Sequence, residues 1–392
     1  MINIAVVGSG SAGPGAAALL ARQGHRVTLF EKAPKMLPVG AGFMLQPSGM
    51  EVLKKLGCEE KVLSSTERID SLYCKNTSGH VLLDLYYEDV KDGLYGCGTQ
   101  RSALLDILIE VCIKSGVSIQ MGCDVTSISK KKDKREVRSA DTSYGDYDLV
   151  LICNGARSEL RSQLQIKQSV KTYPWGAFWF IGKRTEEFSK NQLWQVVEKT
   201  NVLNGFLPTG TSEDLLTLFY SLELSKKDAF YATPLSEWKE SIVRTAPKAE
   251  PFLEQIESYE QLQVAKYNDV VLSRWHDDQV AVLGDAAHAL SPQLGQGVNL
   301  ALQDADALAD AIAKYSNLKD ALAAYSSNRK RQVKFYQLAT RTLTPFFQSN
   351  YPALALFRDF GFPIATKSKW IRDQMTLSMA GYKTGIFTSK NF

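Results

Sequence analysis

Apolar residues at the start of the chain fall into two strand patterns with a helix pattern between them. Residues 2–8 read INIAVVG, a continuous apolar run typical of a buried parallel strand. The next segment is rich in glycine and alanine and ends at Gly24, which predicts a slim helix with a glycine cap. Residues 26–30, RVTLF, predict a second strand, and Glu31 follows it. This order of elements predicts a parallel sheet at the N-terminus.

A second strand-to-helix pattern lies far along the chain, at residues 280–313. Residues 280–284, VAVLG, are again typical of a buried strand, and Asp285 follows them. After a loop, apolar residues recur at helical spacing and predict a helix that begins at about Gly297. Its apolar face comprises Val298, Ala301, Leu302, Ala305, Leu308, Ala309 and Ile312.

The segments between and after these two patterns complete the outline. Residues 173–183 and 215–224 are alternating or continuously apolar and predict strands, and the chain after about residue 318 predicts helices. The one dense basic run, KKKDKR at 130–135, lies between two strand patterns. We interpret it as a solvated hairpin tip rather than a binding patch.

Composition narrows the classes of function. The 392 residues are 44% hydrophobic with a net charge of +4, which indicates a globular protein of two or three domains, or one large α/β unit, and argues against nucleic-acid binding. Six cysteines form no CxxC pair and only four histidines occur, so we expect reduced thiols and no metal. We find no signal-peptide pattern and no apolar run of about 18–20 residues, and we expect a soluble, cytoplasmic protein.

The glycines of the first loop have the spacing of a dinucleotide site. Gly8, Gly10 and Gly13 form GxGxxG, in which the first glycine permits a tight turn, the second lets a pyrophosphate approach, and the third lets the helix pack on the strand. A carboxylate at Glu31 would accept hydrogen bonds from ribose hydroxyls and repel a 2′-phosphate. These features disfavour NADP at this site but do not separate NAD from FAD.

The second glycine-rich helix start favours FAD, because only a long cofactor would reach both helix starts. The adenine end would lie at Gly8–Gly13 and Glu31, and the flavin at the helix that begins at Gly297. Asp285 would accept a hydrogen bond from the ribityl chain. The bare N–H groups of the helix start would face the ring, which becomes negative on reduction.

Several segments together resemble the class A FAD-dependent monooxygenases, the group of para-hydroxybenzoate hydroxylase and the ubiquinone-pathway hydroxylases. GSGSAG with Glu31 is similar to the first FAD motif of the family, and GDAAHALSPQLGQGVNLALQDA to its second, more specific motif. Residues 39–57 resemble the segment beside the flavin. In TQRSALLDIL the family places an arginine, here Arg101, at the pyrophosphate, and in CDVTSI a valine, here Val125, at the adenine. The resemblance covers nearly the whole chain and is weakest from about 165 to 265.

The resemblance implies an α/β fold: a Rossmann-like FAD-binding domain of the GR2 type, with an inserted β-sheet substrate domain and C-terminal helices. We place the FAD-binding domain at residues 1–165 and 266–318, the substrate domain at 166–265, and the helical region at 319–392. The predicted FAD-binding residues are Gly8, Gly10, Ser11, Ala12, Gly13, Glu31, Lys32, Gly42, Arg101, Val125, Asn154, Asp285, Pro292, Gly295, Gly297, Val298 and Asn299.

The resemblance implies hydroxylation of a small, aromatic or apolar substrate by O₂, with NAD(P)H as reductant and a flavin C4a-hydroperoxide as oxygen donor. We name no catalytic side chain, since His288 lies within the second FAD motif and should pack beneath its loop. We expect a monomer or homodimer that binds a small-molecule substrate. Candidates for the walls of its pocket are Tyr173, Trp175, Phe178, Trp179, Phe180, Phe219 and Tyr220.

One departure from the family pattern leaves alternatives open. The family usually has Asp-Gly after the strand in YDLVLICNGARSELR, where this chain has Asn154 and Gly155. Asparagine keeps the size and a carbonyl acceptor but loses the charge, so function is preserved or the handling of NAD(P)H is altered. The alternatives are a flavin-dependent halogenase, a prenyl-type reductase of the same fold, and a non-catalytic FAD-binding protein.

Overall fold

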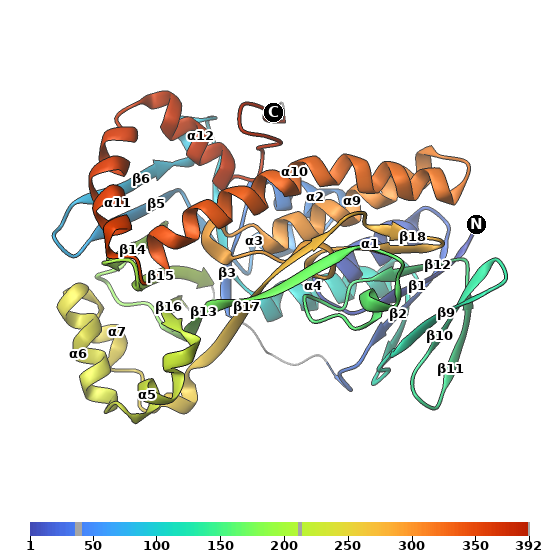
Figure 1. The fold of residues 1–392 in the computed structure, drawn as a ribbon, viewed down its shortest axis with the longest axis horizontal. Coiled ribbons are helices and arrows are strands. Elements are labelled where there is room, and N and C mark those ends of the chain that lie inside the picture. Colours follow the sequence, from blue (N-terminus) through green and yellow to red (C-terminus); the bar gives the residue numbers. More distant parts are fainter. Residues whose placement is uncertain (36–40, 211–213, 391–392) are drawn as a thin grey trace.

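Two large sheets, bridged by a long helix, form the body of the protein (Figure 1). The computed structural model describes residues 1–35, 41–210 and 214–390. In the view of Figure 1 the N-terminal sheet lies on the right and the larger sheet on the left, and α10 (Leu318–Phe347) runs across the top from one to the other. The predicted α/β class, with a β-sheet domain and C-terminal helices, is confirmed.

The N-terminal sheet consists mostly of parallel strands whose carboxyl ends meet the glycine-rich loops. It has six strands in the order β18-β19-β12-β1-β2-β8, and every adjacent pair except β18 and β19 is parallel. The last four residues of β1 are buried, as its unbroken apolar run predicts. The strands are β1 (Asn3–Val7), β2 (Arg26–Glu31), β8 (Ser118–Met121), β12 (Leu149–Ile152), β18 (His276–Asp277) and β19 (Val280–Val282).

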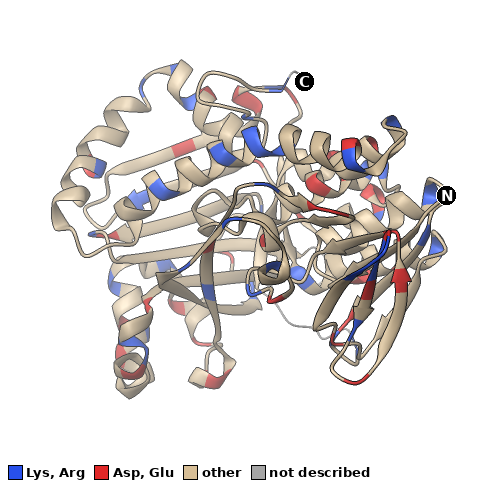
Figure 2. Cartoon of the chain, turned by 45° about the vertical axis from the view of Figure 1, so that its right-hand side comes forward, with Lys and Arg blue, Asp and Glu red and all other residues tan. Residues whose placement is uncertain are grey.

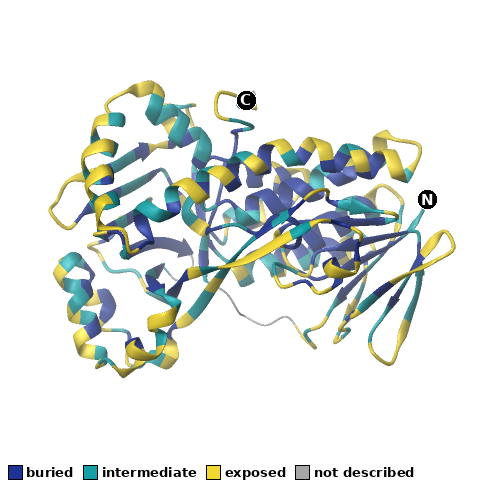
Figure 3. Cartoon of the chain, in the orientation of Figure 1, coloured by how far each residue is buried: buried dark blue, intermediate teal, exposed yellow. Residues whose placement is uncertain are grey.

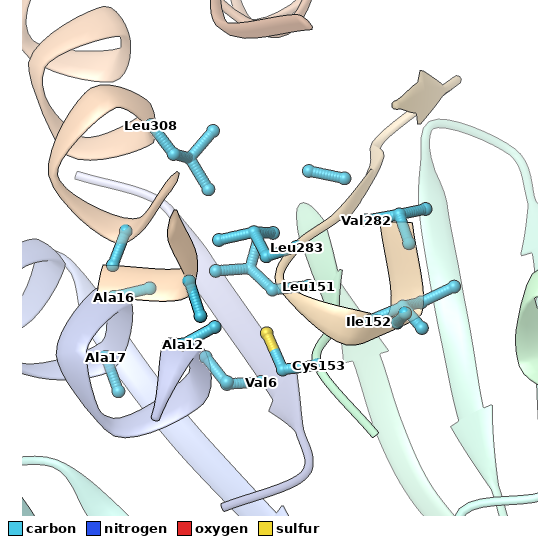
Figure 4. Close-up of a cluster of buried hydrophobic side chains, with 14 of the residues drawn as sticks. Val6, Ala12, Ala16, Ala17, Leu151, Ile152, Cys153, Val282, Leu283 and Leu308 are labelled. Carbon is cyan, nitrogen blue, oxygen red and sulfur yellow. The ribbon is translucent and has the colours of Figure 1, made fainter. Parts of the chain in front are cut away.

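Small side chains let the helices pack closely on this sheet. Ala12, Ala16 and Ala17 of α1 (Ala12–Arg22) lie against Val6 and Leu151 of the sheet and Leu308 of α9 (Gly297–Lys314) (Figure 4). The helix in the second glycine-rich segment begins at Gly297, as predicted. The helices are α1 (Ala12–Arg22), α2 (Pro47–Lys55), α3 (Glu59–Leu63), α4 (Arg101–Lys114) and α9 (Gly297–Lys314).

The basic run 130–135 lies in a three-stranded sheet of order β11-β10-β9 and forms its hairpin turn, which confirms the predicted solvated tip. Lys130, Lys131 and Lys134 pair with Asp278, Asp146 and Asp148 at 2.8, 3.1 and 3.2 Å. Acidic residues thus neutralise the run (Figure 2). The strands are β9 (Ser127–Lys131), β10 (Lys134–Arg138) and β11 (Ser143–Tyr147). A second small sheet has the order β3-β7-β4, with β3 (Gly42–Leu45), β4 (Glu67–Ile69) and β7 (Gly96–Gln100).

The larger sheet has seven strands in the order β17-β13-β16-β15-β14-β5-β6. All adjacent pairs are antiparallel except β14 and β5, which are parallel. Two of its strands come from residues 71–86, so the sheet extends beyond the segment 166–265; the division into domains stays a prediction. The strands are β5 (Ser71–Asn76), β6 (Val81–Tyr86), β13 (Gln168–Lys183), β14 (Gln192–Glu198), β15 (Val202–Gly210), β16 (Leu215–Glu223) and β17 (Gln263–Leu272).

Helices cover parts of the larger sheet and join it to the N-terminal one. Buried aromatic side chains, among them Phe178, Phe206 and Phe252, fill the core between the sheet and a group of short helices. Among the described residues, no helix is both long enough and apolar enough to cross a lipid bilayer. The remaining α-helices are α5 (Lys227–Ala232), α6 (Leu235–Thr245), α7 (Glu250–Leu253), α8 (Asp285–His288), α11 (Pro352–Ala365) and α12 (Lys369–Met379). The 3₁₀ helices are η1 (Tyr87–Asp89), η2 (Leu160–Gln163), η3 (Leu224–Lys226), η4 (Pro247–Ala249), η5 (Tyr259–Gln261) and η6 (Pro292–Leu294).

A buried carboxylate, Asp304 of α9, joins three segments of the chain. One of its oxygens, Oδ2, accepts hydrogen bonds from the Gly284 N–H at 2.9 Å and lies 2.5 Å from His288 Nε2. The other, Oδ1, accepts from Arg329 Nε of α10 at 2.8 Å. Burial alone would raise the pKa of Asp304, but the charges and hydrogen bonds of His288 and Arg329 hold it below its usual value. Asp304 is therefore ionised, and His288 packs beneath the loop as expected.

This network generates a prediction about stability. Asp304→Asn should lower the free energy of unfolding by about 3–5 kcal/mol, because Arg329 is then left buried without its counter-charge. Asp306→Asn, two residues along the same helix, removes only a solvent-exposed pair with Lys55 and should cost less than about 1 kcal/mol. Urea unfolding of the two variants and the wild type measures the difference, and equal losses would contradict the structural role of Asp304.

Candidate cofactor and substrate sites

A long cavity of about 560 Å³ opens at the carboxyl ends of β1, β2 and β12, a size within the usual range for ligand sites. Both glycine-rich segments line it, although they lie almost 300 residues apart in the sequence. The structure therefore brings the two helix starts together, as a long cofactor requires. The predicted residues on this cavity are Gly8, Gly10, Ser11, Ala12, Glu31, Lys32, Arg101, Val125, Asn154, Asp285, Gly297 and Val298. Their contact with FAD stays a prediction.

The other five predicted residues lie elsewhere. Gly13 packs against Gly8 in the first glycine-rich loop. Asn299 is buried behind the loop that carries Pro292 and Gly295, which we call the second glycine loop. Gly42, Pro292 and Gly295 line a second, neighbouring cavity instead of the first. Of the segment 39–57 that resembles the family's flavin-side strand, residues 39 and 40 fall outside the described residues.

The surroundings of each glycine show which ones the protein itself requires. A Cβ atom on Gly8 would lie 2.7 Å from Asn154 Cα, and one on Gly13 would lie 2.0 Å from the Gly8 carbonyl oxygen. In contrast, the nearest atom to a Cβ on Gly10 would be 3.9 Å away, and on Gly297 it would be 3.8 Å away. Because the protein leaves room for a side chain at Gly10 and Gly297, the space beside them is free for a bound group. These two positions fit a cofactor that approaches both helix starts.

The carboxylate of Glu31 lies at the end of β2 and is fixed by the glycine loop. Its Oε2 accepts hydrogen bonds from the Ser9 N–H at 2.9 Å and the Ser9 hydroxyl at 2.7 Å, and its Oε1 accepts from the Ala33 N–H at 3.0 Å. Burial would raise the pKa of Glu31, but these hydrogen bonds and the Lys32 ammonium hold it below its usual value. An ionised, oriented acceptor at this place suits the hydroxyls of a ribose.

Asn299 holds the second glycine loop against β3. Its Oδ1 accepts from the Gln46 N–H at 2.8 Å, and its Nδ2 donates to the carbonyl oxygens of Gly295 at 2.9 Å and Met44 at 3.2 Å. Gly295 has φ +59°, a left-handed conformation that favours glycine. The loop that carries Pro292 and Gly295 is thereby fixed between the two cavities.

Sequence reasoning missed part of the first cavity. Asp124 and Thr126 flank the predicted Val125, and Arg157 and Glu159 follow Asn154, so all four lie in segments that the family motifs already marked. Arg161 of η2, which does not itself line the cavity, was also missed. It is buried, and it donates to the carbonyl oxygens of Ala286 at 2.7 Å and Ala156 at 3.0 Å, which ties the loop after β12 to α8. A lone arginine in a short 3₁₀ helix gave no signal in the sequence.

The second cavity, of about 160 Å³, lies between the larger sheet and the second glycine loop. Its lining comes from the larger sheet, from β3 of the small β3-β7-β4 sheet, from the second glycine loop and from the C-terminal helices. In the part of the chain that the structure describes, none of these lining residues is charged. Of the seven aromatic candidates, Trp179 and Phe219 line it, while Phe178, Phe180 and Tyr220 belong to the aromatic core on the other face. The apolar lining comprises Phe43, Met44, Leu72, Ala177, Leu193, Leu203, Leu207, Leu294 and Met379.

A few polar groups break the apolar wall of this cavity. Gln46 is buried, and its Oε1 accepts a hydrogen bond from the Tyr87 hydroxyl, which fixes the orientation of the amide. Tyr267 Oη and Trp179 Nε1 are buried close to each other, and neither makes a hydrogen bond of good geometry among the described residues. Burial raises the pKa of Tyr267, so its phenol is protonated at neutral pH. Unpaired buried polar atoms beside a cavity are suited to a bound ligand, because leaving them unsatisfied costs free energy.

The fold and the long cavity define a dinucleotide-binding enzyme of the α/β class. A model of the family described as FAD binding domain matches residues 1–337, and the chain belongs to that family. A probable 2-heptyl-3-hydroxy-4(1H)-quinolone synthase of Rhodococcus erythropolis is 27% identical over 328 residues, which cover 82% of this chain and 83% of the relative. The 6-hydroxynicotinate 3-monooxygenase of Bordetella bronchiseptica is 24% identical over 362 residues, covering 86% and 89%.

Solved structures show the same fold. A 2-methyl-3-hydroxypyridine-5-carboxylic acid oxygenase has a TM-score of 0.76 and 23% identity, covering 92% of this chain and 96% of the other. HpxO of Klebsiella pneumoniae, in complex with FAD and uric acid, has a TM-score of 0.83 and 19% identity, covering 97% of both. The predicted class A FAD-dependent monooxygenase family is confirmed: the protein is an FAD-dependent oxidoreductase with NAD(P)H as reductant. A halogenase, a prenyl-type reductase or a non-catalytic protein is not favoured.

The contrast between the glycines generates a prediction about cofactor binding. Gly10→Val should weaken FAD binding by at least about a hundredfold, because the side chain fills space beside the backbone without meeting the protein. The FAD-free form of this variant should unfold within about 1 kcal/mol of the wild type. Gly13→Val should instead destabilise the FAD-free protein itself by several kcal/mol, since its Cβ overlaps the Gly8 carbonyl. Fluorescence titration with FAD and urea unfolding separate the two effects, and wild-type FAD affinity in Gly10→Val would place the pyrophosphate elsewhere.

Proposed function

We propose that this protein hydroxylates an uncharged aromatic substrate, of about one ring in the reacting part, in the cavity beside the second glycine loop. The observation that supports this proposal is the lining of that cavity, which is apolar with a few neutral hydrogen-bonding groups. A volume of about 160 Å³ suits one aromatic ring, since an apolar cavity of about 150 Å³ holds benzene. A substrate carboxylate would be buried there without a counter-charge, which is costly.

The relatives are named for two kinds of aromatic compound, one without and one with a carboxylate. The Rhodococcus relative is named for a quinolone with a heptyl chain and no carboxylate, whereas the Bordetella relative is named for a hydroxynicotinate, which carries one. The uncharged lining favours the first kind of substrate for this chain. Other relatives, such as a 3-amino-4-hydroxybenzoate 2-monooxygenase of Streptomyces cremeus, are also named for aromatic substrates.

The residues of the chain have three roles in this proposal. FAD, when bound, supplies the redox and oxygen chemistry, and NAD(P)H supplies the electrons. The N–H groups at Gly297 and Val298 begin an 18-residue helix, whose dipole stabilises negative charge at the end of the first cavity. The apolar walls exclude water from the reacting atoms. Gln46 and Tyr267 orient the substrate by donating hydrogen bonds to its oxygen.

Asn154 is exposed on the first cavity, where the family usually has aspartate. The amide oxygen of asparagine remains a hydrogen-bond acceptor, as a carboxylate oxygen is. We propose that reduction by NAD(P)H is preserved in this chain. Comparing kcat/KM for NADH and for NADPH measures which of the two reductants the protein prefers.

The test of the proposed function is a matched pair of substrates. A hydroxyquinoline or phenol should stimulate NAD(P)H oxidation and give a product that contains one oxygen atom from ¹⁸O₂. The same ring with an added carboxylate should stimulate oxidation at least about tenfold less, because its charge is unpaired in the cavity. Equal or greater stimulation by the carboxylate would contradict the proposal, and a product without ¹⁸O would contradict hydroxylation.

A variant of one side chain connects this activity to the cavity. Tyr267→Phe removes the unpaired hydroxyl and should lower kcat/KM about five- to tenfold, the value of one hydrogen bond. Tyr259→Phe serves as the matched control, because its hydroxyl donates to the Thr233 carbonyl at 3.0 Å and does not line the cavity. Unchanged kcat/KM in Tyr267→Phe would exclude Tyr267 as a substrate contact.

A further inference from the structure

The helix α11 presents an apolar face to solvent. Leu356, Phe357, Phe360 and Ile364 lie one helical turn or less apart along it, and each is between 63% and 70% exposed. Tyr351 precedes the helix and is 69% exposed, and Trp370, at the start of α12, is 57% exposed. We call these six residues the α11 face. In Figure 3 α11 lies at the outer edge of the molecule, with exposed residues along its outer side.

The area of this face is large for a soluble protein. Without Trp370, the five other residues of the α11 face each expose about two thirds of their surface and together present roughly 500–700 Å² of mostly apolar surface. The largest apolar patch on a typical monomer is roughly 300–600 Å² and is commonly an interaction site. The α11 face thus lies at or above the upper end of that range.

The helix is held firmly in this orientation. Arg358, on the opposite side of α11, has no exposed surface, and it donates to the carbonyl oxygens of Lys199 at 2.5 Å and Phe346 at 2.8 Å. Asp359 pairs with Arg358 at 2.7 Å and accepts from Asn76 Nδ2 at 2.9 Å. A buried arginine with these partners ties α11 to β5 and to the end of α10. The apolar face therefore belongs to an anchored helix and not to a loose tail.

Cations lie at one end of the face. Within residues 351–372, all of which the structure describes, Asp359 is the only acidic residue, and it is engaged with Arg358. Lys367 and Lys369 are exposed just after the helix, and Arg372 donates to the carbonyl oxygens of Thr366 at 2.7 Å and Lys367 at 3.2 Å. Lys369 is partly neutralised by Asp373 at 3.0 Å. Lys369 also donates to the Asp89 carbonyl at 3.2 Å, so the exposed acids Glu88 and Asp89 of η1 lie near Lys369. Lys367 and Arg372 form no ion pair among the described residues and are the free cations at this end of the face.

We propose that the α11 face docks onto the surface of an anionic phospholipid membrane. The apolar side chains would enter the boundary between headgroups and acyl chains, with Tyr351 and Trp370 at the interface and Lys367 among the headgroups. A second copy of the chain is the weaker candidate, because residues 351–372 of a copy offer no free acid to Lys367 and Arg372. Anionic headgroups provide that complement.

The experiment is flotation of the FAD-loaded full chain with vesicles. Vesicles of phosphatidylcholine mixed with phosphatidylglycerol should carry the protein to the top of the gradient, and vesicles of phosphatidylcholine alone should carry several-fold less. The double variant Phe357→Ser, Phe360→Ser should lower the partition coefficient about tenfold or more. Ile113→Ser changes a residue that is 63% exposed on α4 and serves as the matched control, with unchanged binding.

A charge variant and two further measurements make the outcome decisive. Lys367→Glu should lower binding to the anionic vesicles several-fold and leave binding to phosphatidylcholine unchanged. Activity with a water-soluble substrate should be unchanged in all variants, since none of these residues lines either cavity. Absence of binding to anionic vesicles would overturn the proposal. So would concentration-dependent dimerisation in light scattering that the double serine variant abolishes, because the face would then be an interface between copies.

Discussion

The carboxylate of Asp304 ties together segments that the chain order keeps apart. It lies on α9, accepts from the N–H of Gly284 at the end of the last parallel strand, and pairs with Arg329 of α10. Because the same carboxylate contacts the loop and both helices, it fixes the start of α9 at the end of the first cavity. It also fixes α10, whose far end leads to Gln348 in the lining of the second cavity. One buried charge thus joins Gly284, which lines the first cavity, to the helix that ends beside the second.

The two cavities meet at the loop that carries Pro292 and Gly295. The first cavity has polar residues at its Glu31 end and a helix N-terminus at its Gly297 end, which suits a long anionic dinucleotide. The second is apolar, and Asn299 and Gln46 hold the loop in place between the two. The first cavity is thus suited to stabilising charge, and the second to excluding water. Each is needed in a monooxygenase, and each requires a different lining.

The sequence predicted local features well and distant pairings less well. Twelve of the predicted residues surround the first cavity because each lies in a short motif whose geometry is set by glycines and strand ends. The second cavity could not be predicted in this way. Gln46 lies in the segment 39–57 that resembles the family's flavin-side segment, but Tyr267 and Met379 come from distant parts of the chain and stand in no motif. The parallel pairing of β5 with β14, which extends the larger sheet beyond 166–265, likewise depends on long-range packing. Of the aromatic candidates, neighbouring strand residues such as Phe178 and Trp179 point to opposite faces, so only some could reach the cavity.

The central claim is that one FAD molecule spans both glycine-rich helix starts. The most direct measurement is a crystal structure of the protein with FAD bound. The account predicts ribose hydroxyls within hydrogen-bond distance of Glu31, a pyrophosphate against Gly10, and the edge of the flavin ring against the N–H groups of Gly297 and Val298. A flavin ring placed away from the start of α9, or an adenosine placed away from Glu31, would contradict it.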